Sequence, residues 1–287
     1  MIRWGWVLIV AFSVVGCEVV ESLDPRPSPD AMAHLVLIAD VQVGAIRLAR
    51  AAGESTTGNF NAFGEIQDQR DRINRAMSLL HAGDPSTGLA PLPASMHLWL
   101  DNVEHIWHRI DESAQELLAL DEPVLHLAEQ IGEYSALVPW LQAAIDGVLR
   151  ELIASGATIH EVYMVSRQLV LADRMLRRAG QIMSGGVGTT VAADALSRDS
   201  AIFRRVLEGL VSGDEQLQMT AIDNEDALSE LQEVITLYAK IGDGIDAVLG
   251  AFPELVSARE AADSIWLDSE LLADQAAHLA GAYTDSN

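Results

Sequence analysis

Four arginines in two similar segments are the residues whose type and spacing could bind a ligand. Arg47 and Arg50 lie three residues apart in GAIRLARAAG, and Arg174 and Arg177 repeat that spacing in LADRMLRRAG. A guanidinium among apolar neighbours in an acidic protein can hold an anion through forked hydrogen bonds. The same side chains can instead pair with Asp or Glu of adjacent helices, which contributes about 0–1 kcal/mol per surface pair. The sequence leaves both interpretations open.

Two histidines are the other candidates for chemistry. His105 and His108, with Glu104 and Glu112 beside them, could present metal ligands on one face of a helix. A metal site in a helical bundle draws ligands from several helices, so we expect a solvated face and no metal. The motifs GxSxG, Walker A and HExxH are absent from the sequence, and its carboxylates are too numerous to be diagnostic. We therefore expect neither an enzyme nor a cofactor.

The N-terminus predicts export. Residues 4–15 are almost entirely apolar, but this run is shorter than the roughly 20 residues that span a bilayer. The only cysteine, Cys17, ends a Val-Val-Gly-Cys segment that resembles a bacterial lipoprotein signal. We expect a signal peptide at 1–17 with Cys17 as the lipid attachment site, and a solvated tether at 18–31. A plain signal anchor with an incidental cysteine is the alternative.

The composition limits the classes of partner. The 287 residues are 49% hydrophobic, with a mean hydropathy of +0.18, which is enough apolar material for two small cores. The net charge of −24 repels phosphate backbones, so nucleic acid is excluded as a partner.

The elements that carry the arginines recur with a period of about 130 residues. AMSLLHAGD is echoed by VLEGLVSGD, and Pro123 by Pro253. We infer a duplication into two helical modules, at 32–157 and 158–284, each with four helices. The predicted fold is all-α: two tandem four-helix bundles of up-and-down helices, elongated and stacked end to end.

Several helix ends are also predicted. Gly53 is expected to end the first helix and Gly83 the second, and Thr158 with Glu161 is expected to form a capping box. An apolar stripe that includes Leu231 and Tyr238 predicts a helix at 224–249. Pro139 is expected to kink or divide the fourth helix.

Three stretches carry a resemblance to a known family. They are SRQLVLADRMLRRAG, SAIFRRVLEGLVSGD and PELVSAREAADSIWLDSELLA, together with the loop that follows Leu80. They resemble the extracytoplasmic sensor region of PilJ-type proteins, the methyl-accepting chemotaxis transducers of type IV pilus systems, over residues 31–282. That module is related to nitrate and nitrite sensors, in which an arginine of the first helix grips the anion. Arg47 has the most similar position here.

The resemblance implies a non-catalytic periplasmic sensor or binding module. The lipid anchor is expected from Cys17, and by resemblance to enterobacterial lipoproteins the glutamate that follows Cys17 slightly favours the outer membrane. PilJ-type transducers continue into a second membrane helix, a HAMP segment and a cytoplasmic signalling hairpin, whereas this sequence ends at Asn287. Expected partners are a pilin, a chemoreceptor or another pilus protein, with a small ligand or a homodimer left open. The alternatives are a small-anion sensor of the nitrate or nitrite type and a structural envelope lipoprotein. Ligand identity and oligomeric state stay open.

Overall fold

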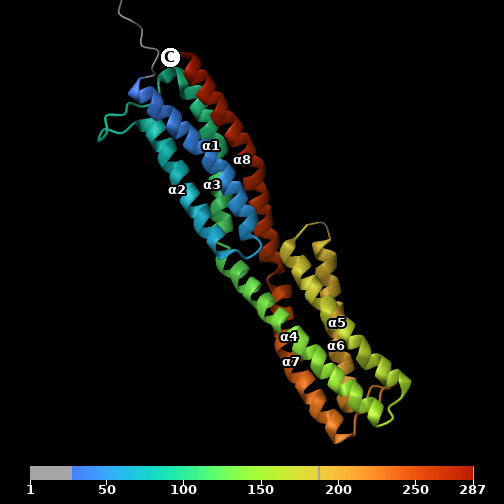
Figure 1. Ribbon diagram of the computed structural model, residues 1–287. Helices are drawn as coiled ribbons and strands as arrows, with labels where there is room; N and C mark the ends of the chain where they lie inside the picture. Colours follow the sequence, from blue (N-terminus) through green and yellow to red (C-terminus); the bar gives the residue numbers. More distant parts are fainter. Residues whose placement is uncertain (1–27, 187, 287) are drawn as a thin grey trace, which may run out of the picture.

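The structure is a computed structural model that describes residues 28–186 and 188–286. Cys17, the predicted signal peptide and most of the predicted tether lie outside the described residues. Within those residues the chain is helical, with a short 3-10 turn (Ala94–Met96) and no strand beyond isolated bridges. The helices are α1 (Pro29–Ser55), α2 (Phe60–Ala82), α3 (His97–Leu118), α4 (Asp121–Ala154), α5 (Ile159–Ser184), α6 (Thr189–Ser212), α7 (Glu225–Gly250) and α8 (Phe252–Ser286). The predicted all-α fold is confirmed (Figure 1).

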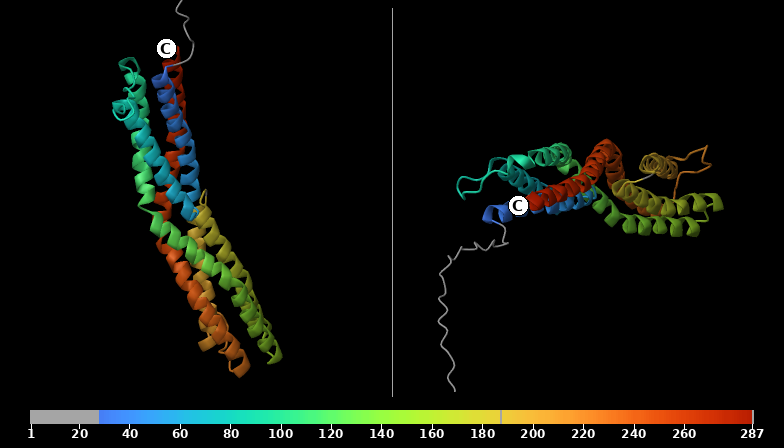
Figure 2. Two further views of the ribbon diagram at one scale, coloured as in Figure 1. Left: turned by 60° about the vertical axis from the view of Figure 1, so that its left-hand side comes forward. Right: turned by 90° about the horizontal axis from the view of Figure 1, so that it is seen from above.

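The helices form two four-helix bundles. In bundle 1, α1 packs against α2 and α8, and α3 packs against α8. In bundle 2, α4 packs against α5 and α7, and α5 packs against α6. Figures 1 and 2 show the two bundles end to end in an elongated molecule, as predicted. Both ends of the described chain lie at the end of bundle 1 that faces away from bundle 2 (Figure 1).

The helices group differently from the two predicted modules at 32–157 and 158–284. Each module keeps three helices together and gives its fourth helix, α4 or α8, to the other bundle. The reason lies in the linkers. Ala119 and Leu120, between α3 and α4, keep near-helical backbone angles (φ −70°, ψ −13° and φ −105°, ψ 11°), and Ala251, between α7 and α8, does the same (φ −86°, ψ 6°). None of these residues reverses the chain, so α3 runs on into α4 and α7 runs on into α8.

Two of the predicted helix-end signals lie where the structure has them. The capping box of Thr158 and Glu161 is present, and Gly83, with φ +70°, follows α2 as its C-cap. Gly53 is an exception, because α1 continues to Ser55 and the left-handed conformation falls on Gly58 instead. Pro139 does not divide α4, which is one helix across it.

Buried positions recur between the predicted modules at nearly constant separations. Those of α1 recur in α5 after 127 residues, those of α2 in α6 after 130, and those of α3 and α4 in α7 and α8 after 131. Examples are the pairs Leu48 and Met175, Leu80 and Leu210, Leu100 and Leu231, and Leu127 and Ala258. These separations support the predicted duplication.

Within the described part of the chain, α1 is the helix that is long and apolar enough to cross a membrane, judged by length and composition alone. In this structure α1 lies between α2 and α8 and buries one face, including Ile38, Val41 and Leu48, in bundle 1. The core helix of a bundle has the same composition, because it too must be apolar along the buried face.

Candidate functional site

Arg174, one of the four candidate arginines, is engaged by a buried carboxylate. Its Nε atom donates to Asp199 Oδ2 at 2.7 Å, and its Nη2 atom donates to Asp199 Oδ1 at 2.5 Å. Asp199 belongs to α6 and is only 3% exposed. Forked bonds between two charged groups are among the strongest hydrogen bonds in proteins. This geometry favours the ion-pair interpretation of Arg174.

Arg178, one helical turn further along α5, brings a second guanidinium to the same carboxylate. It donates to Asp199 Oδ2, and to the backbone carbonyl of Ala195 at 2.7 Å. Burial lowers the pKa of Arg178, and the charge of Arg174 lowers it further. Arginine starts from so high a pKa that it stays charged at neutral pH. Two positive charges therefore hold one buried negative charge and tie α5 to α6.

Sequence reasoning singled out Arg174 but missed its partner. A signal for Asp199 does exist, because Leu196, Phe203 and Leu210 mark the buried face of α6 and place Asp199 on it. A carboxylate at a buried helical position needs a cation nearby.

Arg50 and Arg177 make local contacts on the helix surface. Arg50 lies 3.9 Å from Glu54, and Arg177 pairs with Asp173, both at the i, i+4 spacing. Each of these side chains is exposed, and such pairs stabilise a helix by only about 0.3–0.5 kcal/mol. The positions leave both guanidinium groups accessible to solvent.

Arg47 differs from its counterpart Arg174. It is exposed and forms no ion pair within residues 28–186 and 188–286. The residue of α2 that corresponds to Asp199 is Gln69, a neutral side chain that is 3% exposed. Bundle 1 therefore lacks the carboxylate that holds Arg174 in bundle 2. The structure does not bring the four arginines into one site, since two lie on α1 in bundle 1 and two lie on α5 in bundle 2.

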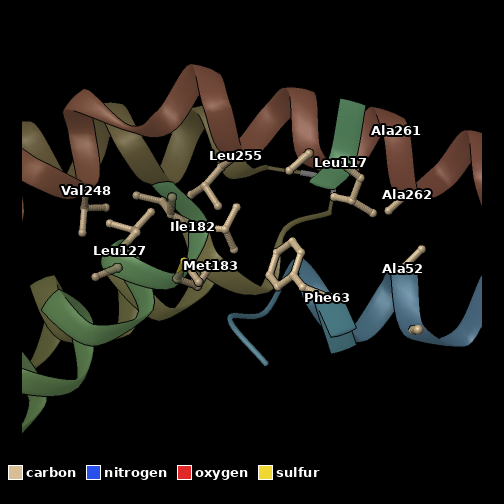
Figure 3. Packing of buried hydrophobic residues seen from close by; sticks show 14 of the residues in the cluster. Ala52, Phe63, Leu117, Leu127, Ile182, Met183, Val248, Leu255, Ala261 and Ala262 are labelled. Carbon is tan, nitrogen blue, oxygen red and sulfur yellow. The ribbon is translucent and has the colours of Figure 1, made fainter. Parts of the chain in front are cut away.

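The two bundles meet at a hydrophobic junction that sequence reasoning did not identify. Phe63 of α2, Leu117 of α3, Leu127 of α4, Met183 of α5 and Leu255 of α8 lie together there (Figure 3). All five are buried members of one cluster that runs through both bundles. The core is therefore continuous, and a shift of helices in one bundle must be accommodated by the other.

Two equivalent glycines at the junction contact α4 and α8, the helices that each predicted module gives to the other bundle. A Cβ atom on Gly58, which has φ +84°, would overlap Ala128 of α4, and one on Gly185, which has φ +70°, would overlap Arg259 of α8. Arg259 donates to the carbonyl groups of the last two residues of α5, at 2.9 Å for Ser184. A positive charge at this end of a helix also interacts favourably with its dipole. The separation of Gly58 and Gly185, 127 residues, is the signal that could have revealed these contacts.

Two buried polar side chains fix the loops at the outer ends of the bundles. Glu161 accepts from the Thr158 N–H at 2.9 Å and from the hydroxyl and N–H of Thr220. The Thr220 hydroxyl first, and then the Thr158 N–H, lower the pKa of Glu161 from 4.5 to about 2. His34 has the corresponding place in α1 and donates from Nε2 to the Ala90 carbonyl at 2.8 Å.

The candidate histidines lie on an exposed face of α3. His108 pairs with Glu112 at 3.3 Å, and Glu104 pairs with His81 of α2 at 3.2 Å. Across the described ranges 28–186 and 188–286, no group of three or more His, Cys, Asp or Glu side chains could hold a metal ion.

The fold and these paired charges define an elongated, all-α module of two bundles with a shared core. No protein-family model matches the chain. It is 30% identical over 244 residues to the protein PilJ of Pseudomonas aeruginosa, covering 85% of this chain and 36% of PilJ. It is 26% identical over 253 residues to a protein named as methyl-accepting chemotaxis AlkN of Alcanivorax borkumensis, covering 87% of this chain and 36% of that protein.

The predicted resemblance is thereby confirmed, and most of the chain is similar to one region of PilJ and of the chemotaxis protein AlkN. The chain spans about a third of the length of these curated relatives.

Proposed function

We propose that this chain is a non-catalytic sensor or binding module of a type IV pilus or chemosensory system. The observation that carries the proposal is the similarity to PilJ over 85% of the chain. The paired arginines, the exposed histidine face and the continuous core fit a protein that binds by contact. Its partners would be pilus or chemoreceptor proteins, and its place the periplasmic side of a membrane.

The proposed mechanism is a change in helix packing. Binding at bundle 2, which lies furthest from the chain ends, would shift α4 or α7 (Figure 1). Because α4 continues from α3 and α7 continues into α8, that shift would reach bundle 1 through the junction. A ligand drives such a change only by binding one packing arrangement more tightly than the other.

A chimera tests the pathway. A chimeric PilJ carries residues 28–286 of this chain in place of the matching region. It is expressed in a Pseudomonas aeruginosa strain that lacks its own PilJ, and pilus-dependent twitching is measured. We expect twitching above the level of PilJ with that region deleted. A chimera that is present in the membrane at the normal level but gives only the deletion phenotype counts against the proposal and favours a structural envelope protein.

Anchoring through Cys17 is tested separately. Cys17→Ser should release the full chain from membranes into the soluble periplasmic fraction, because a single acylated cysteine would be the attachment point. A variant that stays membrane-bound supports an uncleaved signal anchor instead.

Anion binding at Arg47 is the second candidate function. The observation that favours Arg47 over Arg174 is its exposed guanidinium, which has no carboxylate partner among the described residues. Calorimetric titration with nitrate, nitrite and small carboxylates should give heat for the natural protein and none for Arg47→Ala. Heat that persists unchanged in Arg47→Ala rejects this site.

A further inference from the structure

A groove lies between α6 and α7 in bundle 2. Its volume of about 450 Å³ falls within the range of roughly 300–1,000 Å³ that is typical of small-molecule sites. The groove has a largely apolar lining, formed by Leu207, Val211, Ile235, Tyr238 and Ala239. Gly242 forms part of the wall, and a Cβ atom added to it would meet nothing within 4 Å. Open space therefore lies directly beside this helical glycine.

The corresponding surface of bundle 1 is closed by an ion pair. Asp111 of α3 stands where α7 has Gly242, and it accepts from Arg70 Nε of α2 at 2.5 Å. The counterpart of Arg70 in α6 is Ser200, whose hydroxyl is buried against Tyr238 at 2.9 Å. Bundle 2 thus lacks both side chains that bridge the helices in bundle 1. Of these two positions, Gly242 lines the groove directly.

Tyr238 gives the groove a fixed apolar floor. Its hydroxyl donates to the Ser200 carbonyl at 2.8 Å, and its ring stacks on Phe203 with the ring centroids 4.3 Å apart. Burial raises the pKa of Tyr238, so the phenol is neutral at physiological pH. The residue is only 5% exposed and its hydroxyl is bonded inside the bundle, so the exposed part of the ring adds a small apolar area to the floor.

The rim of the groove is acidic. Glu208 of α6 and Asp243 and Asp246 of α7 line it, against the single guanidinium of Arg204. All four of these side chains belong to exposed residues, in a protein whose net charge is −24. An apolar lining below a negatively charged rim complements a ligand with an apolar body and a positive head.

We propose that this groove binds a small amphiphilic cation, with its apolar chain over Tyr238 and its ammonium group at the acidic rim. The proposal rests on the sensor function above and names the class of ligand for it. The volume suits a small molecule. An occupant would contact both α6 and α7 and change how they pack, and α7 continues through Ala251 into α8 of bundle 1.

Calorimetric titration of the full chain with decyltrimethylammonium, kept below its micelle concentration, tests the site. We expect one-to-one binding that is at least about 10-fold tighter than that of decyl sulfate, which has the same chain, or tetramethylammonium, which has the same head. The double variant Asp243→Asn, Asp246→Asn should weaken binding about 5-fold and reduce its salt dependence.

Gly242→Leu is the decisive variant, since its side chain fills the groove and leucine favours a helix more than glycine does. Binding should fall at least about 10-fold, while circular dichroism and the melting temperature show an intact fold. Gly132→Leu is the matched control, because Gly132 lies exposed in α4 with equally open space, and this variant should bind normally.

Equal binding by Gly242→Leu and the natural protein overturns the proposal, as does equal binding of decyl sulfate. A cationic amphipathic peptide that binds where decyltrimethylammonium does not also overturns it, in favour of a protein partner. The titration needs no other pilus component. A failed titration with a working chimera therefore rejects the groove alone, and a failed chimera with a working titration rejects the pathway alone.

Discussion

Replacing Asp199 tests whether Arg174 has a structural role in bundle 2 that its counterpart Arg47 lacks in bundle 1. Asp199→Ala leaves Arg174 and Arg178 without their shared carboxylate. Breaking a buried pair by deleting one partner costs about 3–5 kcal/mol. The Arg174 and Arg178 side chains are 38% and 24% exposed, so both can turn partly towards water. We therefore expect a loss of about 2–4 kcal/mol in the free energy of unfolding.

The internal repeat supplies the comparison. Arg174→Ala leaves Asp199 with Arg178 alone and should cost about 1–2 kcal/mol. Arg47→Ala, at the equivalent position of α1, removes an exposed side chain without an ion-pair partner in the described structure and should change stability by less than about 0.5 kcal/mol.

Urea unfolding followed by circular dichroism at pH 7 measures all three variants. The slopes with denaturant should match that of the natural protein, because the surface exposed on unfolding does not change. The reasoning is refuted if Asp199→Ala costs less than about 1 kcal/mol, or if Arg47→Ala costs as much as Arg174→Ala.

Two further predictions concern the ends of bundle 2 and the junction. Folding lowers the pKa of Glu161 from 4.5 to about 2, so its stabilisation is complete above about pH 4.5 and is lost as the pH falls towards 2. Glu161→Gln should therefore cost about 2 kcal/mol at pH 7 and clearly less at pH 2.5 in urea unfolding, and a cost that does not change with pH contradicts the assignment. Gly58→Ala combines backbone strain with overlap on Ala128, whereas Gly156→Ala, with φ +79° and nothing within 4 Å, has strain alone. Thermal unfolding should show Gly58→Ala losing at least about 1 kcal/mol more than Gly156→Ala, and equal losses would mean that the junction is not tightly packed.

The sequence by itself determined the helices and their buried faces. The capping box at Thr158 and the glycine after α2 are local signals, and both act within one turn of chain. The apolar stripe of α7, which includes Leu231 and Tyr238, follows from helical periodicity alone. The resemblance to PilJ also came from the sequence.

Only the tertiary structure decided how the helices are grouped and which side chains meet. Pattern and propensity do not say whether a short linker such as Ala251 reverses the chain or lets it run on, because both outcomes bury the same stripes. That one choice exchanges α4 and α8 between the bundles. Likewise, an arginine such as Arg174 is equally compatible with an anion and a carboxylate until the facing helix is placed. Its pairing with Asp199, and the open groove beside Gly242, depend on contacts between residues that are distant in sequence and on the register in which two helices pack.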